Sequence, residues 1–154
     1  MTDFLSPEKR SERMSRIRGQ NTQPELALRK ALHRLGLRYR LHNATLPGKP
    51  DLVFPRYKAV VFVHGCFWHS HTNCSIANIP KSNSEFWREK FKKNKERDAR
   101  VVASLEKSGW HVLIVWECEL TNREKIRATS EIIAASIICH KKNLADSTPR
   151  HRER

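Results

Sequence analysis

Apolar and polar positions along the chain follow two periods, that of a helix and that of a strand. The first helical stretch has four apolar residues that share one face: Leu28, Ala31, Leu32 and Leu35. Thr22 followed three residues later by Glu25 has the spacing of a capping box, and Gly36 is a typical helix end. The pattern therefore predicts a helix over residues 22–35.

Three short segments after this helix have the composition of strands, and turn-forming residues separate them. Their bounds are Arg38–His42, Asp51–Phe54 and Ala59–His64, with Pro47-Gly48 and Pro55 between them. A later segment, Trp110–Trp116, is apolar almost throughout, which is typical of a buried strand. The sequence thus predicts a sheet of these segments.

Two more helices complete the pattern. One begins at Ser82-Asn83-Ser84-Glu85 and ends near Gly109, and the other is capped by Thr121-Asn122-Arg123-Glu124 and runs to about His140. The order αβββαβα predicts a single α/β domain over residues 21–140, with a mixed sheet flanked by helices. Residues 1–20 are expected to form a basic arm, and residues 141–154 a basic, flexible tail.

The long helix has polar residues on a face that should be buried. Six positions are spaced by threes and fours, so that they share one face: Trp87, Phe91, Asn94, Asp98, Val101 and Leu105. Burying a carboxylate without a partner is costly. We therefore expect a cation or a histidine beside Asp98, unless the side chain tips outward at the rim of the stripe. The basic flank of this helix is either a solvated face or a path for phosphates.

The chain is strongly basic, with 30 Lys and Arg against 16 Asp and Glu and a formal charge of +14. Such an excess repels itself and is typical of proteins that bind a polyanion, so nucleic acid is the favoured partner, with a merely basic or ribosome-associated surface as the alternative. No apolar stretch predicts a membrane span or a signal peptide. We therefore expect a cytoplasmic protein with reduced cysteines.

The cysteine pattern favours a metal site over disulfides. Cys66 and Cys74 flank a loop that also contains His69 and His71, and Cys118 follows the last strand. Three thiolates and one imidazole form a closed tetrahedral zinc set, which fits a structural ion, and His69 and His71 compete for the nitrogen position. The alternative is unliganded thiols. Cys139, on the last helix, is expected to be a packing residue.

A second set of residues indicates hydrolysis. Pro50-Asp51 begins a strand, as in many Mg²⁺ nucleases, but Phe62 and His64 stand where those enzymes have a second acid and a lysine. A metal with one carboxylate must rely on water, backbone carbonyls and the DNA phosphate. The attacking water then needs another base, and His69 with Asp98 behind it would be an oriented one. His64 could support the phosphate or the leaving group. The alternative for Pro50-Asp51 is a simple junction of turn and strand.

Several motifs in this order resemble the very-short-patch-repair (Vsr) endonucleases. They are Asp51, Phe62-Val63-His64-Gly65-Cys66-Phe67-Trp68-His69, Glu85-Phe86-Trp87, Glu96-Arg97-Asp98 and Val115-Trp116-Glu117-Cys118. The resemblance implies a restriction-endonuclease-like fold with a structural zinc loop over residues 64–84. It also implies a strand-specific nick 5′ of the thymine in a T:G mismatch left by deamination of 5-methylcytosine, which begins very-short-patch repair.

The resemblance assigns roles by position. Asp51 would bind Mg²⁺ with help from the Val63 carbonyl, His69 would be the general base oriented by Asp98, and His64 and Glu25 would complete the catalytic site. The expected zinc ligands are Cys66, His71, Cys74 and Cys118, and the expected aromatic wedge in DNA is Phe67, Trp68 and Trp87. Flat aromatic side chains suit insertion beside a weakly stacked mispair.

The implied partners are double-stranded DNA with a T:G mismatch and, by function, a cytosine-5 DNA methyltransferase and mismatch-repair proteins. We expect a monomer. Two rival interpretations remain: a module that binds distorted DNA without cutting it, and a restriction endonuclease that cuts both strands of unmodified sites. The missing second carboxylate and the aromatic triplet argue against the latter.

Overall fold

A computed structural model describes residue 8 and residues 21–147 of the chain. The predicted arm therefore lies, apart from residue 8, outside the described residues, and so does the end of the predicted tail. The helices are α2 (Gln23–Arg34), α3 (Ser84–Lys107) and α4 (Arg123–Asp146), and the strands are β1 (Arg40–Leu41), β2 (Leu52–Phe54), β3 (Ala59–His64) and β4 (His111–Trp116). This order confirms the predicted αβββαβα fold.

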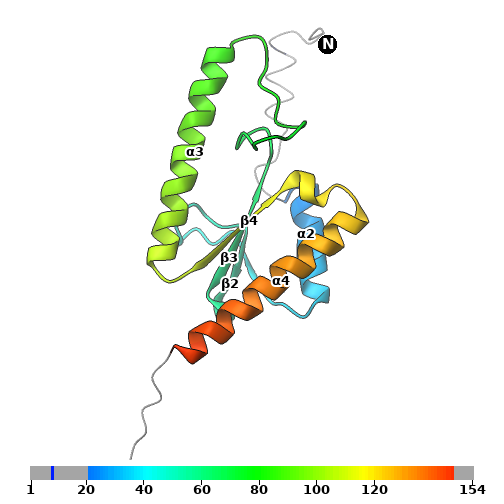
Figure 1. Cartoon of the computed structure of the whole chain (residues 1–154), viewed down its shortest axis with the longest axis vertical. Coiled ribbons are helices and arrows are strands. Elements are labelled where there is room, and N and C mark those ends of the chain that lie inside the picture. Colours follow the sequence, from blue (N-terminus) through cyan, green and yellow to red (C-terminus); the bar gives the residue numbers. More distant parts are fainter. Residues whose placement is uncertain (1–7, 9–20, 148–154) are drawn as a thin grey trace, which may run out of the picture.

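The four strands form one mixed sheet in the order β1-β2-β3-β4. Strands β1 to β3 pair antiparallel, and β3 pairs parallel with β4, in a register that places His64 beside Trp116. The parallel pair requires a crossover, and α3 provides it. Helix α3 covers one side of the sheet, while α2 and α4 lie together on the other, and α3 extends well past the sheet beside the loop of residues 65–83 (Figure 1).

Strand periodicity divides the core between the two faces of the sheet. On β3, Ala59 and Val61 join a large cluster that α2 and α4 cover, while Val60 and Phe62 join a smaller cluster with Leu105 of α3. Two short 3-10 helices, Pro55–Tyr57 and Glu117–Leu120, connect these elements. His64 continues the Val60 and Phe62 series, so its side chain is on the side of the sheet that faces α3.

Gly48 places the β1–β2 loop close to α3. Its φ is +72°, and a Cβ atom there would lie 2.4 Å from a methyl carbon of Val101. Only glycine adopts this backbone conformation without strain and also allows so close an approach. Asp51 follows three residues later and lines the same cavity as Val101 of α3.

Several local expectations are corrected. Leu35 is 46 % exposed, because α2 ends at Arg34 and Leu37 takes the inward position. Strand β4 is mostly half-buried rather than buried, since it lies at the edge of the sheet and Ile114 is exposed. Strand β1 is shorter than predicted, with only two residues.

The last helix also differs from the expectation. It continues to Asp146, past the predicted end at His140, so the beginning of the predicted flexible tail is helical. Cys139 is exposed rather than packed. The buried side of α4 includes Ile133 and Ile137, and a residue two positions after Ile137 points away from it. Across residues 21–147, no helix is long and apolar enough to cross a membrane.

Candidate active site and metal centre

The α3 side of the sheet contains a cavity of about 450 Å³ that charged, polar and apolar residues line together. Asp51, just before β2, and His64, at the end of β3, point into it from the sheet, and Asp98 lies on its α3 wall. The other lining residues are His42, Gly48, Lys49, Phe62, Val63, His69, Arg97, Val101 and Val102. The cavity thus unites four of the predicted catalytic residues with the cations of Lys49 and Arg97.

Asp51 is held in place by the neighbouring strand. Its Oδ2 accepts a hydrogen bond of 2.7 Å from the backbone N–H of Val63. Burial raises the pKa of Asp51 to about 6, although the Val63 hydrogen bond opposes the shift. A nearby cation favours the ionised form, so a carboxylate in this environment is suited to bind one.

His69 and Asp98 form a direct pair. The distance between His69 Nδ1 and Asp98 Oδ2 is 2.5 Å, and both side chains are mostly shielded from solvent. Asn94, one turn earlier on α3, donates a hydrogen bond of 2.9 Å to the carbonyl of Trp68 and so fixes the loop beside the helix. The polar stripe of α3 is therefore an attachment for this loop, which confirms the expectation of a histidine beside Asp98.

His64 and His69 lie face to face. Their ring centroids are 3.8 Å apart and their planes differ by 5°. Burial and then the adjacent His69 ring lower the pKa of His64. Two stacked imidazoles resist carrying charge together. Because only His69 has a carboxylate bonded to its ring, the geometry favours a neutral His64 beside a His69 that can accept a proton.

Glu25 lies behind Asp51 in a buried group that the sequence analysis missed in part. His42 is between them, with its Nε2 atom 3.1 Å from Glu25 Oε1 and its Nδ1 atom 3.9 Å from Asp51 Oδ1. Arg29 forms an ion pair with Glu25 one helical turn away. Glu25 shares a helical face with Leu28 and Leu32, and a charged residue on this apolar stripe was the available signal of a buried pair.

The four predicted zinc ligands form one cluster. Their ligand atoms all lie within 4.8 Å of one another, and the members are Cys66, His71, Cys74 and Cys118. His71 rather than His69 is the histidine of this cluster. The donor set has the number and type of atoms of a closed tetrahedral zinc site, and it could hold a metal. Burial raises the pKa of the Cys66 thiol, so a bound cation would have to stabilise its thiolate.

Trp116 connects the two sites, and the sequence analysis did not assign it a role. Its ring stacks on that of His71, with centroids 4.1 Å apart, and contacts His64 edge-on at 5.3 Å. Glu117, the next residue, accepts a hydrogen bond from the backbone N–H of Cys66. The end of β4 therefore fixes both the cysteine cluster and the wall of the cavity.

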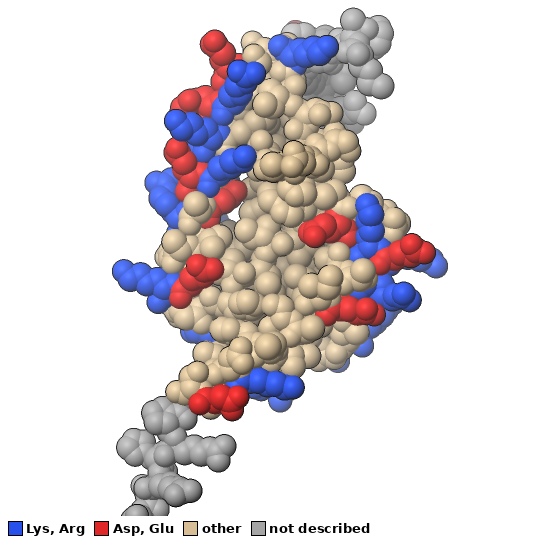
Figure 2. Space-filling model, in the orientation of Figure 1, with Lys and Arg blue, Asp and Glu red and all other residues tan. Residues whose placement is uncertain are grey.

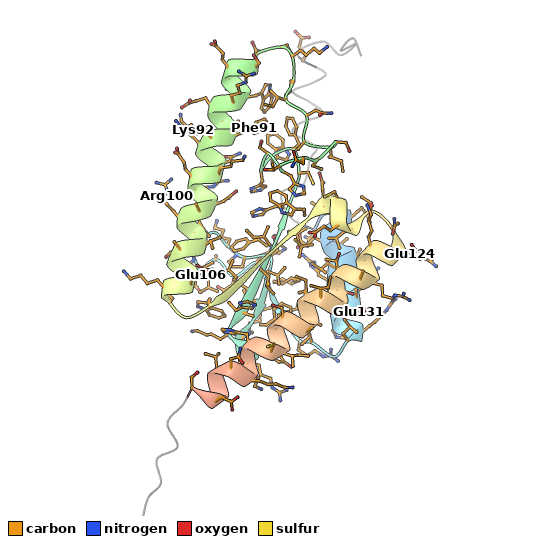
Figure 3. The ribbon with its side chains drawn as sticks, in the orientation of Figure 1. Phe91, Lys92, Arg100, Glu106, Glu124 and Glu131 are labelled. Carbon is orange, nitrogen blue, oxygen red and sulfur yellow. The ribbon has the colours of Figure 1, made fainter. Side chains whose placement is uncertain are left out.

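The expected wedge residues pack against one another. The ring centroids of Phe67 lie 5.2 Å from Trp68 and 5.3 Å from Trp87, and Phe91 is buried beneath them. Phe91 points from α3 toward the loop, whereas Lys92 and Arg100 lie on the outer side of the helix (Figure 3). Trp87 contacts both Phe91 and Phe67, so one position serves the helix stripe and the aromatic cluster.

Charged residues are unevenly distributed around this region. Along the outer edge of α3, Lys and Arg alternate with acidic residues, while the surface over the adjacent loop is largely uncharged in the view of Figure 2. The cavity itself has two cations in its lining, Arg97 on α3 and Lys49 in the β1–β2 loop, and Phe67 and Trp68 of the aromatic cluster directly precede His69. A carboxylate, a histidine–aspartate pair and nearby cations form a candidate hydrolytic site next to a candidate metal centre.

Known proteins share these features of sequence. A family described as DNA mismatch endonuclease Vsr matches residues 2–75. The DNA mismatch endonuclease Vsr of Escherichia coli (strain K12) is 45 % identical over 126 residues, which cover 82 % of this chain and 80 % of that protein. The type II nicking enzyme V.XorIIP of Xanthomonas oryzae pv. oryzae is 49 % identical over 128 residues, covering 83 % of this chain and 93 % of that enzyme. The type II nicking enzyme V.NmeAIP of Neisseria meningitidis is 50 % identical over 123 residues, 80 % of this chain and 87 % of its own length.

The chain therefore belongs to the Vsr family of DNA mismatch endonucleases. This confirms the resemblance found in the sequence.

Proposed function

We propose that this protein is a Mg²⁺-dependent endonuclease that nicks duplex DNA on one strand, 5′ of the thymine of a T:G mismatch. The observation that carries the proposal is the convergence of Asp51 and the His69–Asp98 pair on one cavity. The names of the relatives, mismatch endonuclease and nicking enzymes, support both the substrate and the single-strand cut.

Asp51 and the carbonyl oxygen of Val63 are the groups that would hold Mg²⁺. Carboxylate and carbonyl oxygens are the ligands this ion accepts, with water and DNA phosphate completing the shell. When bound, the ion supplies positive charge against the scissile phosphate and acidifies a water molecule. The cations of Lys49 and Arg97 at the same cavity favour the approach of the phosphate.

His69 is the general base of the proposal. Its Nδ1 faces Asp98, so Nε2 is the nitrogen that accepts the proton of the attacking water. Asp98 fixes that tautomer and stabilises the imidazolium that forms. His64, kept neutral by burial and by the neighbouring ring, can support the phosphate or the leaving oxygen. Glu25 completes the site from behind Asp51, with His42 between the two carboxylates.

The aromatic cluster would recognise the mispair. Phe67 and Trp68 directly precede His69 in the loop, Trp87 packs on Phe67, and Phe86, which packs on Trp87, is 59 % exposed. Inserting aromatic side chains costs less at a mismatch, because the mispair stacks weakly. The ligand set of Cys66, His71, Cys74 and Cys118 would hold a structural zinc that fixes the loop carrying Phe67 and Trp68.

In the cell, such a nick would begin very-short-patch repair after deamination of 5-methylcytosine. The protein would act in the cytoplasm on nucleoid DNA, as a monomer, downstream of a cytosine-5 DNA methyltransferase and together with mismatch-repair proteins. Basic character favours the association with DNA.

Nicking of labelled duplexes tests the proposal. With Mg²⁺, a T:G duplex in varied flanking sequences should be nicked on the thymine strand, and the matched T:A duplex should stay largely intact. Asp51→Asn should abolish the nick while DNA affinity is retained. Equal cutting of both duplexes would indicate a restriction endonuclease, and binding without any cut would indicate a recognition module.

A further inference from the structure

We propose that the guanidinium of Arg29 fills a cation site formed by Glu25, His42 and Asp51. It would act as a built-in counter-ion that positions the metal-binding carboxylate. Glu25 would then be a positioning residue rather than a metal ligand. The inference rests on the proposed function in one respect, the role of Asp51 as the Mg²⁺ ligand.

The contacts of Arg29 converge on one nitrogen. Its Nη2 atom donates to Asn21 Oδ1 at 2.7 Å, lies 2.9 Å from His42 Nε2, and forms the ion pair with Glu25 Oε1. Arg29 Nε has no hydrogen-bond partner among the residues that the structure describes. Nη2 thus contacts two members of the proposed cation site, Glu25 and His42, and is linked to Asp51 through His42.

The surrounding groups are those that would bind a metal ion if Arg29 were absent. One ligand atom from each of Glu25, His42 and Asp51 lies within 4.8 Å of the others. Two carboxylates and an imidazole are a common ligand set for divalent cations. Arg29 contributes one positive charge at every accessible pH, so it neutralises a group that would otherwise attract a cation.

Burying the Glu25–Arg29 ion pair costs free energy, so we infer that the pair has a role other than stability. Glu25 is 2 % exposed and Arg29 is 8 % exposed. Removing two charges from water can cost as much as their attraction returns, so a buried ion pair by itself adds little stability. Orienting the site is a role that an apolar pair of the same volume could not take over.

The cluster also fixes the carboxylate of Asp51. Since Arg29 can only donate, His42 Nε2 accepts, and the His42 proton is then on Nδ1, which faces Asp51 Oδ1 at 3.9 Å. The other oxygen of Asp51 accepts from the Val63 N–H. Both oxygens thus have a defined environment, and Arg29 influences that of Oδ1 through His42.

Binding of Mn²⁺ tests the counter-ion. Free Mn²⁺ would be counted by electron paramagnetic resonance during titration of the full chain without DNA, in buffer with enough Zn²⁺ to fill the cysteine cluster. Arg29→Met should bind Mn²⁺ about tenfold more tightly than the parent, because a second carboxylate and an imidazole become available as ligands. The double variant Arg29→Met with Glu25→Gln should return to the parent affinity.

Two further variants complete the test. Lys30→Met removes an exposed cation from the next position of α2 and should leave Mn²⁺ affinity unchanged, which controls for net charge. Glu25→Gln alone should bind Mn²⁺ within about twofold of the parent, since Glu25 is engaged by Arg29. This variant keeps the test decisive even if Arg29→Met does not fold.

The outcomes separate this inference from the proposed function. Parent affinity in folded Arg29→Met, or a tenfold loss in Glu25→Gln, would overturn the counter-ion. Undiminished binding by Asp51→Asn would instead contradict Asp51 as the metal ligand.

Discussion

The two faces of the sheet are packed in different ways. The face under α2 and α4 holds a continuous apolar cluster that includes Leu28, Phe54, Val61 and Ile137. The face under α3 has a smaller apolar cluster around Leu105. Beyond this cluster lies the cavity, which is lined by polar side chains such as Asp51 and His64 as well as by apolar ones. Apolar side chains thus dominate the face under α2 and α4, while paired polar groups are concentrated at the cavity on the face under α3.

The two faces therefore differ in what they contribute: one mainly stabilises the fold, and the other holds the candidate catalytic groups. Apolar burial stabilises the fold in proportion to the area removed from water, so the α2/α4 face should contribute most of the stability. Buried polar groups are retained only with partners: on the α3 face His69 has Asp98 and Asp51 has the Val63 N–H, and on α2 Glu25 has Arg29. Substitutions on the two faces should therefore change different measured quantities.

The largest expected effect is on the rate, from the α3 face. His69→Ala should lower the single-turnover nicking rate by about 10³–10⁴, and Asp98→Asn by less, because the proposed Mg²⁺ would also acidify the water. The double variant should fall little below His69→Ala, since the two residues act as one unit. Unfolding midpoints measured on the same samples should change little. Strictly additive rate losses would mean that Asp98 does something other than orient His69.

The next effect concerns the metal centre that joins the loop to β4. Cys118→Ala should lose the proposed zinc and destabilise the protein by about 4 kcal/mol, because the ion would connect the loop after β3 to the end of β4. Metal analysis together with thermal unfolding measures both changes. The exposed Cys139 provides the matched control, and Cys139→Ala should keep zinc and stability. A parent protein that is equally stable and free of zinc would contradict the structural role.

A smaller effect, on stability alone, is expected from the α2/α4 face. Ile137 is fully buried, and Ile137→Ala should cost about 3 kcal/mol through lost transfer energy and a residual cavity. Ile138, the next residue, is 40 % exposed, and Ile138→Ala should change stability by about 0.5 kcal/mol or less. Urea unfolding measures both. The comparison of the faces fails if folded Ile137→Ala also loses nicking rate by more than a few fold.

The smallest effect is a gain in stability at Asp51, the carboxyl proposed to bind the metal. The pKa of Asp51 rises from 3.8 to about 6 in the folded protein, so its contribution to stability is present at low pH and lost as pH rises through about 6. Asp51→Asn keeps an acceptor for the Val63 N–H and has no charge to bury. Without Mg²⁺ at pH 8 it should be more stable than the parent by about 2 kcal/mol, and the difference should vanish near pH 4. A variant less stable than the parent at pH 8 would show that the ionised carboxylate is not destabilising.

Local sequence determined much of this protein. The period of α3 predicted which residues face inward, and the exposed fractions agree: Phe91 and Leu105 are buried, and Asn94 and Asp98 are half-buried among them. The period-two pattern likewise predicted β3, and the Pro47-Gly48 turn marks the junction before Asp51. Periodicity specifies which side of an element is covered, because side-chain direction follows from the backbone alone.

Tertiary contacts decided the rest. His69 and His71 are two residues apart in one loop, and only the end of β4 and the wall of α3 assign one to Cys118 and the other to Asp98. No local pattern distinguished Arg29 and His42, since their importance comes from tertiary contacts that lead from Arg29 through His42 to Asp51. The sequence determines which chemical groups are available. The partner of each buried polar group is instead fixed by packing between segments that are distant along the chain.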